Sequence, residues 1–257
     1  MKEQSINTLF IGKVAIHLAT VDSTNRFAQE YISKSRPIEG TVIRADEQSA
    51  GRGQLGSTWQ SEAAANITMS LILQPKFLLA RQQFLLSAAM SLALYDFLNT
   101  YDLPAALSIK WPNDIYIGNK KIAGMLIENT LRGAYLDWSI IGIGININQL
   151  NFDPQLPNPT SLAIALNKKV EINDCLFQLY PALERQYLRM QAGRASEIFE
   201  DYTQKLFQVN KKALYKLIDE EKVIEAELVG VDESGKMCLA YEGKVVAYDL
   251  KKVSPVL

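Results

Sequence analysis

Residues 48–61 (QSAGRGQLGSTWQS) have the composition of a loop that binds an anion. Three glycines in this stretch, Gly51, Gly53 and Gly56, surround Arg52. Glycines let a main chain bend sharply and present its N–H groups to a nearby ligand. A guanidinium among them offers a planar fork of donors for carboxylate or phosphate oxygens. Short glycine-rich runs are also common in surface loops that bind nothing, so this stretch alone leaves both interpretations open.

The spacing of these glycines excludes two familiar phosphate-binding motifs. No Gly-Lys-Ser or Gly-Lys-Thr follows at the distance that a P-loop needs, and no G-x-G-x-x-G sequence opens a helix. Trp59 follows closely and can cover an aromatic base such as adenine. The residue types therefore indicate an anion clamp, and the rest of the chain must decide which anion it holds.

A second polar group comes just before a helical pattern. Asp22, Ser23, Thr24 and Asn25 precede apolar residues at helical spacing, and Asp22 or Ser23 is a good helix N-cap. Capping alone would explain these residue types and is the interpretation that the local sequence favours. Hydroxyls and an amide at a helix N-terminus also form a hydrogen-bonding wall for a polar ligand, which stays open as the alternative.

Residues 141–148 (IGIGININ) alternate isoleucine with small or amide residues. The isoleucines form one face of a strand, which requires a core, and Gly142, Gly144, Asn146 and Asn148 form the other. A face without bulk suits a strand whose backbone lies against a ligand. A closely packed helix would require the same glycines, so the pattern does not distinguish the two.

Two lysines meet in a predicted β-hairpin. Residues 110–114 (KWPND) interrupt an apolar run at a proline, which suits a bulge or an edge strand. Because side chains alternate along a strand, only one of Lys120 and Lys121 can point inward. Lys121 shares its face with Ala123 and Met125, so we predict Lys121 as the inward lysine.

The remaining pattern places these motifs on a scaffold of strands and helices. Strands are predicted at residues 13–18, 41–45, 66–73 (half-buried) and within 107–130, with an amphipathic helix at 81–99. A loop covers residues 150–160, helices occupy 161–205, and short alternating segments over 212–257 predict a small β-barrel. We place a domain boundary near residue 210.

Composition restricts the class of protein. With 257 residues, 48% of them hydrophobic, the chain has room for one large domain and a small appendage. A net charge of −1 does not favour broad nucleic-acid binding. Cys175 and Cys238 have no CxxC partner, and no signal peptide or 18-residue apolar run is evident. We therefore expect a cytoplasmic protein with reduced thiols. His17 has no identifiable orienting partner and is interpreted as structural.

Five motifs in a fixed order make the sequence closely resemble the biotin protein ligases. The motifs are Ser23-Thr24-Asn25, Gln48–Trp59 with its GRG core, KWPND at 110–114, Lys121–Gly124 and Gly142–Asn146. The resemblance implies an α+β fold. In that fold a mixed β-sheet with helices, similar to class II aminoacyl-tRNA synthetases, is followed by a small SH3-like β-barrel. It divides the chain into a catalytic biotin- and ATP-binding domain, 1–209, and the barrel, 210–257.

The resemblance also implies a reaction in two steps. The carboxylate of biotin attacks the α-phosphate of ATP, and a lysine of a biotin carboxyl carrier protein then takes biotin from biotinyl-5′-AMP. Two anions must meet in the first step despite their repulsion, so cations are needed where they react. Arg52 and Lys121 are the candidates, acting by electrostatic stabilisation, and Mg²⁺ would bind the polyphosphate. Asp114 is the candidate acceptor for the proton of the incoming lysine.

The family motifs imply two overlapping sets of binding residues. The set for biotin is Ser23, Thr24, Asn25, Gln48, Gly51, Arg52, Gly53, Gln54, Trp111, Lys121, Gly124, Gly142 and Gly144. The set for ATP is Arg52, Trp59, Asn66, Asn113, Lys121 and Asn146. Within the first set, Trp111 either walls the biotin tail or belongs to the core.

The chain departs from the family pattern in two places. Gln54 stands where many members carry an arginine, and a neutral amide cannot pair with the acyl-phosphate, so leakage of free biotinyl-AMP is a consequence to test. About 22 residues precede the Ser-Thr-Asn motif, too few for the winged-helix domain of the family's repressor branch. We therefore expect no DNA binding and no membrane partner, while a homodimer is an option.

Two other functions compete with this interpretation. Lipoate or octanoyl ligases and transferases share the catalytic architecture, but the GRG…W loop followed by KWPND argues against them. A non-catalytic ligand-binding module is the second alternative. A degenerate site would need neither Arg52 nor Lys121, and this chain has both.

Overall fold

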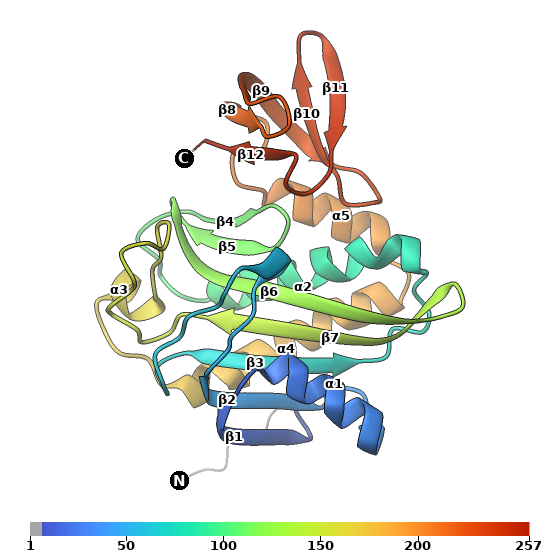
Figure 1. Ribbon diagram of the computed structural model, residues 1–257, viewed down its shortest axis with the longest axis vertical. Helices are drawn as coiled ribbons and strands as arrows, with labels where there is room; N and C mark the ends of the chain where they lie inside the picture. The colour runs from blue at the N-terminus through green and yellow to red at the C-terminus, as the bar shows by residue number, and fades with distance from the viewer. Residues whose placement is uncertain (1–6, 257) are drawn as a thin grey trace.

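The computed structural model describes residues 7–256, whose strands form two sheets (Figure 1). The larger sheet has seven strands in the order β1-β2-β3-β7-β6-β5-β4. Their bounds are β1 (Ala15–Val21), β2 (Val42–Gln48), β3 (Ile67–Leu73), β4 (Leu107–Lys110), β5 (Asp114–Ile117), β6 (Lys120–Arg132) and β7 (Tyr135–Ile145). β1 and β2 run parallel, and all other neighbours are antiparallel. The predicted mixed sheet is confirmed.

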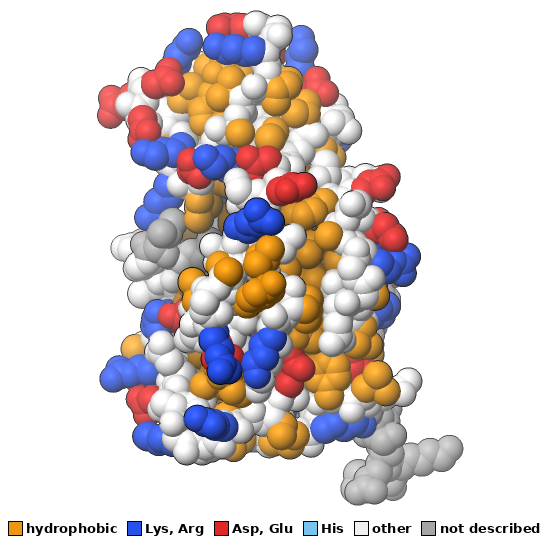
Figure 2. Space-filling view, turned by 90° about the vertical axis from the view of Figure 1, so that its right-hand side faces the viewer, with side chains coloured by type: hydrophobic (Ala, Val, Ile, Leu, Met, Phe, Trp, Pro, Cys, Tyr) orange, Lys and Arg blue, Asp and Glu red, His pale blue; other side chains and the backbone are white. Residues whose placement is uncertain are grey.

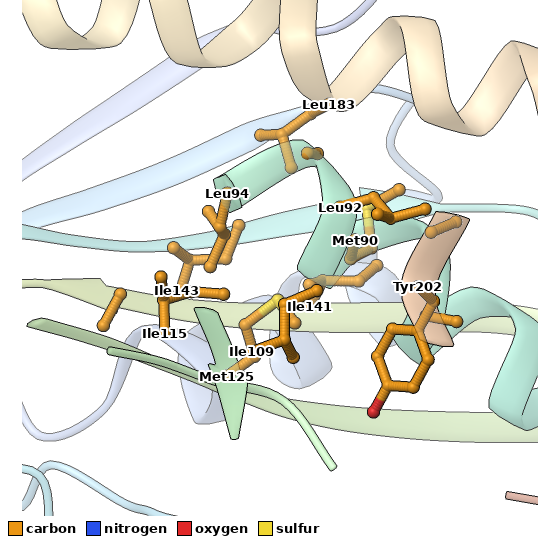
Figure 3. Close-up of a cluster of buried hydrophobic side chains, with 14 of the residues drawn as sticks. Met90, Leu92, Leu94, Ile109, Ile115, Met125, Ile141, Ile143, Leu183 and Tyr202 are labelled. Atoms are coloured by element: carbon orange, nitrogen blue, oxygen red, sulfur yellow. The ribbon is translucent and has the colours of Figure 1, made fainter. Parts of the chain in front are cut away.

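Helices cover both faces of this sheet. Their bounds are α1 (Thr24–Ser35), α2 (Gln83–Leu98), α3 (Leu162–Leu166), α4 (Ile172–Gln191) and α5 (Ala195–Gln204), with short 3-10 helices η1 (Gln54–Gly56) and η2 (Ala80–Gln82). On one face, Ala28 of α1 packs in a small cluster with Ile43, Ile72 and Ile140. The opposite face carries the main core under α2, α4 and α5 (Figures 1 and 3).

The isoleucine face of β7 belongs to the main core, as its alternation predicts. Ile141 and Ile143 lie in one buried cluster with Met90 and Leu92 of α2 and with Leu183 of α4 (Figure 3). The glycine face of β7 therefore points to the other side of the sheet, where α1 lies.

Two elements are more deeply buried than the sequence pattern predicts. All seven residues of β3 are buried, although its polar alternation predicts one exposed face. The polar face is covered by α1, and the hydroxyl of Ser70 lies 2.8 Å from Thr24 Oγ1 and 2.6 Å from Asn25 Oδ1. Helix α2 is buried on most sides instead of being amphipathic, because it packs between the sheet and helices α4 and α5.

The KWPND sequence forms the turn between β4 and β5. Residues 111–113 connect the two strands, and the peptide bond between Trp111 and Pro112 is cis. β4 is the edge strand of the sheet, so the edge position is confirmed. The predicted alternative, a bulge at this proline, is wrong, because the strand direction reverses here.

The second sheet is formed by the last five strands of the chain. It is antiparallel, in the order β11-β10-β9-β8-β12, with bounds β8 (Lys212–Leu217), β9 (Lys222–Val231), β10 (Met237–Tyr241), β11 (Lys244–Tyr248) and β12 (Val253–Pro255). It lies beside α5 (Figure 1). Trp111 Nε1 donates to the carbonyl of Gly235 at 2.9 Å and links this sheet to the β4–β5 turn. The predicted α+β class is confirmed, while the boundary between 1–209 and 210–257 stays a prediction.

Within residues 7–256, no helix has both the length and the apolar character needed to cross a membrane.

Candidate active site

One cavity of about 180 Å³ brings together most of the polar and charged motifs. The predicted residues that line it are Ser23, Thr24, Asn25, Gln48, Arg52, Gly53, Gln54, Trp59, Asp114, Lys121, Gly124, Gly142 and Gly144. They come from the start of α1, the glycine-rich loop and the strands of the large sheet. Arg52 and Lys121, 69 positions apart in the sequence, therefore face one cavity.

The N-terminus of α1 presents polar groups to this cavity. Ser23 occupies the N-cap position, but its side chain makes no capping hydrogen bond. Gln48 Oε1 accepts from the backbone N–H of Thr24 at 2.7 Å, and the Thr24 hydroxyl lies 3.1 Å from the same oxygen. Because Ser23 does not use its hydroxyl as a cap, this geometry supports the ligand wall over the capping interpretation.

The glycine-rich loop is a small hairpin closed by its own backbone. The Trp59 N–H donates to the Gly51 carbonyl at 3.0 Å, and the Gly53 N–H donates to the Ser57 carbonyl at 2.7 Å. A side chain at Gly51 would overlap the Trp59 carbonyl, so this glycine is needed for the loop to close. Gly56 has φ +84°, which L-residues rarely adopt. Gly51 itself does not line the cavity.

Each of the two cations is paired with a carboxylate. Arg52 Nη2 lies 2.7 Å from Glu128 Oε1, and Lys121 Nζ lies 2.7 Å from Asp114 Oδ2. The Arg52 side chain is 47% exposed and that of Lys121 31%, so both remain accessible from the cavity side. Lys121 Nζ also lies 5.8 Å from the centre of the Trp59 ring, within the range of a cation–π contact.

Lys121 faces the cavity for a different structural reason from the predicted one. The pairing of β5 with β6 shifts register, because Ile115 opposes Ala123 while Tyr116 opposes Lys121. The extra residue on β6 is a β-bulge, which moves Lys121 onto the face of Gly124. A side chain at Gly124 would contact the Lys121 ammonium and the Asp114 carboxylate. The predicted face shared with Ala123 and Met125 is wrong, although Lys121 is the inward lysine and Lys120 is exposed.

The two glycines of β7 make room for different side chains. A Cβ at Gly142 would overlap the amide of Asn25 from α1, and a Cβ at Gly144 would overlap the Trp59 indole. The close approach of α1 therefore requires a glycine at position 142, and the position of Trp59 in the cavity wall requires a glycine at position 144. Among the residues that the structure describes, Trp59 Nε1 is buried without a hydrogen-bond partner.

Four predicted residues besides Gly51 lie outside the cavity lining. Asn66 Nδ2 donates to Gln149 Oε1 at 2.6 Å, and Asn113 Nδ2 donates to the Met125 carbonyl at 3.0 Å. Asn146 Nδ2 donates to the Thr160 carbonyl at 2.9 Å. All three side chains are buried and connect segments that are separated in the sequence. Trp111 is also buried, and of its two proposed places the core is the one it occupies.

Asp114 has two lysine neighbours, Lys121 in an ion pair and Lys110 opposite it in the β4–β5 pair. Burial lowers the pKa of Lys110, and the positive charge of Lys121 adds to this effect while Asp114 opposes it. The Lys110 ammonium donates to the hydroxyl of Tyr116 at 3.3 Å. Burial and then the charge of Asp114 raise the pKa of Tyr116 to about 12, so this hydroxyl stays protonated at neutral pH. Lys110 thus supports the strand pair that carries Asp114 and Lys121.

The structure adds two polar residues that the sequence reasoning missed. Glu128 pairs with Arg52, and Ser70 is bonded to the start of α1. Glu128 follows Gly124 and Leu126 at alternate positions of β6, and this alternation was a usable signal. His17 has an orienting partner after all, since its Nε2 lies 2.7 Å from Asp46 Oδ1. That pair is nearly half exposed and does not line the cavity.

Comparison with known sequences decides the family. Residues 18–146 match the biotin/lipoate A/B protein ligase family. The chain belongs to this family. The resemblance inferred from five short motifs is thereby confirmed.

Relatives of this biotin/lipoate ligase family member include proteins named as biotin ligases. The chain is 34% identical over 188 residues to a bifunctional ligase/repressor of Bacillus spizizenii, an alignment that covers 71% of this chain and 56% of that protein. It is 35% identical over 175 residues to the biotin–[acetyl-CoA-carboxylase] ligase of Paracoccus denitrificans, covering 65% and 70% of the two chains. The chain thus spans just over half the length of the Bacillus relative.

The fold is also that of a solved biotin ligase. The structure of a biotin protein ligase from Aquifex aeolicus, in complex with biotin and ATP, aligns with a TM-score of 0.77 at 26% identity. The alignment covers 95% of this chain and 99% of that one, so both sheets are included. The architecture implied by the sequence motifs is confirmed over nearly the whole chain.

Proposed function

We propose that this chain is an ATP-dependent biotin protein ligase. It would convert biotin to biotinyl-5′-AMP and transfer biotin to a lysine in the carrier domain of a biotin-dependent carboxylase. The observation that carries this proposal is that Arg52 and Lys121 line one cavity together with the polar start of α1. The names of the relatives and the ligands of the Aquifex structure support the same assignment.

The lining of the cavity contains groups that suit both ends of biotin. Ser23, Thr24 and Gln48 provide hydroxyl and amide groups that can donate to and accept from a ureido ring. Arg52 and Lys121 line the cavity as well and can bind a carboxylate. Trp59 lies on the glycine face of β7, where its ring can stack on adenine.

In the first step a carboxylate oxygen of biotin attacks the α-phosphorus of ATP. The new bond joins that oxygen to phosphorus, and the bond to the pyrophosphate oxygen breaks. Arg52 and Lys121 compensate for the negative charge that gathers around the phosphorus. A guanidinium has five N–H donors and an ammonium three, so each cation can hold its protein carboxylate and a ligand oxygen together.

In the second step the amine of the acceptor lysine attacks the acyl carbon of biotinyl-5′-AMP. An amide bond forms, the bond between that carbon and the AMP oxygen breaks, and the nitrogen loses a proton. Asp114 lines the cavity 2.7 Å from Lys121 Nζ, and we assign it two tasks. It orients Lys121, and it is the acceptor for the proton of the attacking amine.

We propose that Mg²⁺ enters this site with the polyphosphate of ATP. Within residues 7–256 the structure contains no group of three or more His, Cys, Asp and Glu side chains arranged to hold a metal ion. Mg²⁺ commonly keeps several waters and binds through substrate phosphates, which suits a site with few protein ligands. When bound, the ion would neutralise phosphate charge. The contacts of Asn113 and Asn146 with backbone carbonyls support a role in ordering the loops around the nucleotide.

A single assay tests the proposed function. Purified protein is incubated with ATP, Mg²⁺ and labelled biotin, and the label is followed onto a biotin carboxyl carrier domain. We expect label on the carrier that depends on ATP and is lost when the acceptor lysine is replaced by arginine. Labelled lipoate is run in parallel, because lipoate ligases belong to the same family. Transfer of lipoate without transfer of biotin would reject the proposal. Recovery of the activity in a cytoplasmic extract would test the predicted location.

A further inference from the structure

The ion pair between Arg52 and Glu128 connects the glycine-rich loop to the large sheet. Arg52 is the only charged residue of residues 51–59, and its guanidinium lies 2.7 Å from Glu128 on β6. The other hydrogen bonds of the loop join its own residues. Across the described chain, no other side-chain hydrogen bond or ion pair ties residues 51–59 to the rest of the molecule. Apart from the cation–π contact of Lys121 with Trp59, the side-chain attachment of the loop through hydrogen bonds and ion pairs therefore depends on Glu128.

Glu128 is itself held firmly from the opposite side. Its Oε2 accepts from Asn25 Nδ2 at 2.8 Å, while Oε1 receives Arg52. Asn25 is 3% exposed, its Nδ2 also lies 3.2 Å from the Leu126 carbonyl, and its Oδ1 lies 2.6 Å from the Ser70 hydroxyl. These contacts fix which end of the amide faces Glu128. Gly142 leaves the space that this amide fills.

We propose that Glu128 is a positioning residue that fixes Arg52 at the cavity and keeps the glycine-rich loop closed over the acyl-adenylate. The proposal rests on the function proposed above. Gln54 cannot supply a second cation in this loop, so Arg52 is the one positive charge that residues 51–59 bring to the cavity, opposite Lys121 on β6. A mixed anhydride reacts with water, and its survival until the acceptor lysine arrives depends on how rarely the loop opens. Glu128 acts on that intermediate only through Arg52.

The first test measures escape of the intermediate from Glu128→Gln. This variant keeps the shape of the side chain and removes its charge. Free biotinyl-5′-AMP is trapped by hydroxylamine, which forms the hydroxamate and releases AMP. We expect trapping to rise at least threefold over the unaltered protein. Asp137→Asn is the matched control, because Asp137 is a half-buried carboxylate on the neighbouring strand β7 that does not line the cavity. It should behave like the unaltered protein.

A double-variant cycle separates positioning from a merely structural effect. If Glu128 acts through Arg52, adding Glu128→Gln to Arg52→Ala changes trapping by less than twofold. The same threefold rise in both backgrounds would overturn the proposal, as would unchanged trapping in Glu128→Gln alone.

A second readout does not require the proposed activity. Trypsin cleaves after arginine, and an ion pair that holds Arg52 against the sheet protects that bond. We expect Glu128→Gln to speed cleavage after Arg52 at least threefold, with cleavage elsewhere unchanged, which also shows that the variant is folded. Equal rates at Arg52 would overturn the proposal. If the unaltered protein forms no biotinyl-5′-AMP, the proposed function fails while this measurement still decides the role of Glu128 in closing the loop.

Discussion

Replacing Gly144 by alanine tests the wall of the cavity with a single methyl group. The three atoms nearest to an added Cβ at Gly144 all belong to the Trp59 indole and are too close to stay in place. Gly144 lies on β7, which is hydrogen-bonded on both sides by β3 and β6. Trp59 lies at the end of a loop that bonds mainly to itself. The indole must therefore move and the strand must stay.

The expected magnitude follows from which side gives way. Overpacking a rigid core costs about 1–3 kcal/mol, but a mobile partner absorbs most of this, so the free energy of unfolding should fall by less than about 1 kcal/mol. Stacking of a base on an aromatic side chain is worth roughly 1–3 kcal/mol. If Trp59 covers adenine, Gly144→Ala should weaken ATP binding roughly 5- to 150-fold.

Isothermal titration calorimetry with ATP measures this change directly. Ser139→Ala is the matched control, because Ser139 is buried on the same strand and does not line the cavity. Trp59→Ala should weaken ATP binding to a similar extent, and the two substitutions together should do little more than either alone. Wild-type affinity for ATP in Gly144→Ala would refute the reasoning. The reasoning would also be refuted if Gly144→Ala weakened ATP binding just as much in a protein that already carries Trp59→Ala.

Three further predictions use other parts of the structure. Arg52→Ala and Lys121→Ala should each slow biotin-dependent ATP–pyrophosphate exchange at least tenfold, roughly 1.4 kcal/mol of barrier, because each removes a cation from the reacting centre; unchanged exchange would remove that role. Gln54→Arg should reduce hydroxylamine trapping of free adenylate, and equal trapping would discard the argument about this residue. Burial raises the pKa of Tyr116 and of Tyr180 to about 12 in the folded chain. The pKa of tyrosine in the unfolded chain is about 10. Deprotonation therefore favours the unfolded chain as the pH rises from 10 towards 12, and the free energy of unfolding falls over that range. Urea denaturation should give a lower free energy of unfolding at pH 11 than at pH 8. The drop should be larger for the unaltered protein than for the Tyr116→Phe, Tyr180→Phe double variant, which lacks both hydroxyls.

Local patterns predicted the parts of the site that depend on a single strand or loop. The alternation in residues 141–148 assigned one face of β7 to the core and the other to small groups, and both assignments hold. The apolar spacing over residues 81–99 placed helix α2 correctly. In each case the signal comes from residues that are neighbours in sequence, which is where periodicity carries information.

Apart from the bulge predicted at Pro112, the errors arise where distant segments decide the outcome. Burial of the polar face of β3 requires α1, whose Thr24 and Asn25 lie 46 and 45 positions from Ser70. The face of Lys121 depends on a register shift between two strands, which strict alternation along one strand cannot reveal. The ion pair of Arg52 spans 76 positions. Such contacts depend on tertiary packing, and a single sequence gives no direct measure of it.

The glycines of β7 show how a backbone position can control a charge that it never touches. Gly142 leaves room for the Asn25 amide, and that amide orients the Glu128 carboxylate. The carboxylate in turn holds the guanidinium of Arg52 at 2.7 Å. A ligand strand and a closely packed helix appeared to be competing explanations for this face. Both explanations apply here. Asn25 of α1 packs against Gly142, and its amide belongs to the series of contacts that places the Arg52 guanidinium at the cavity.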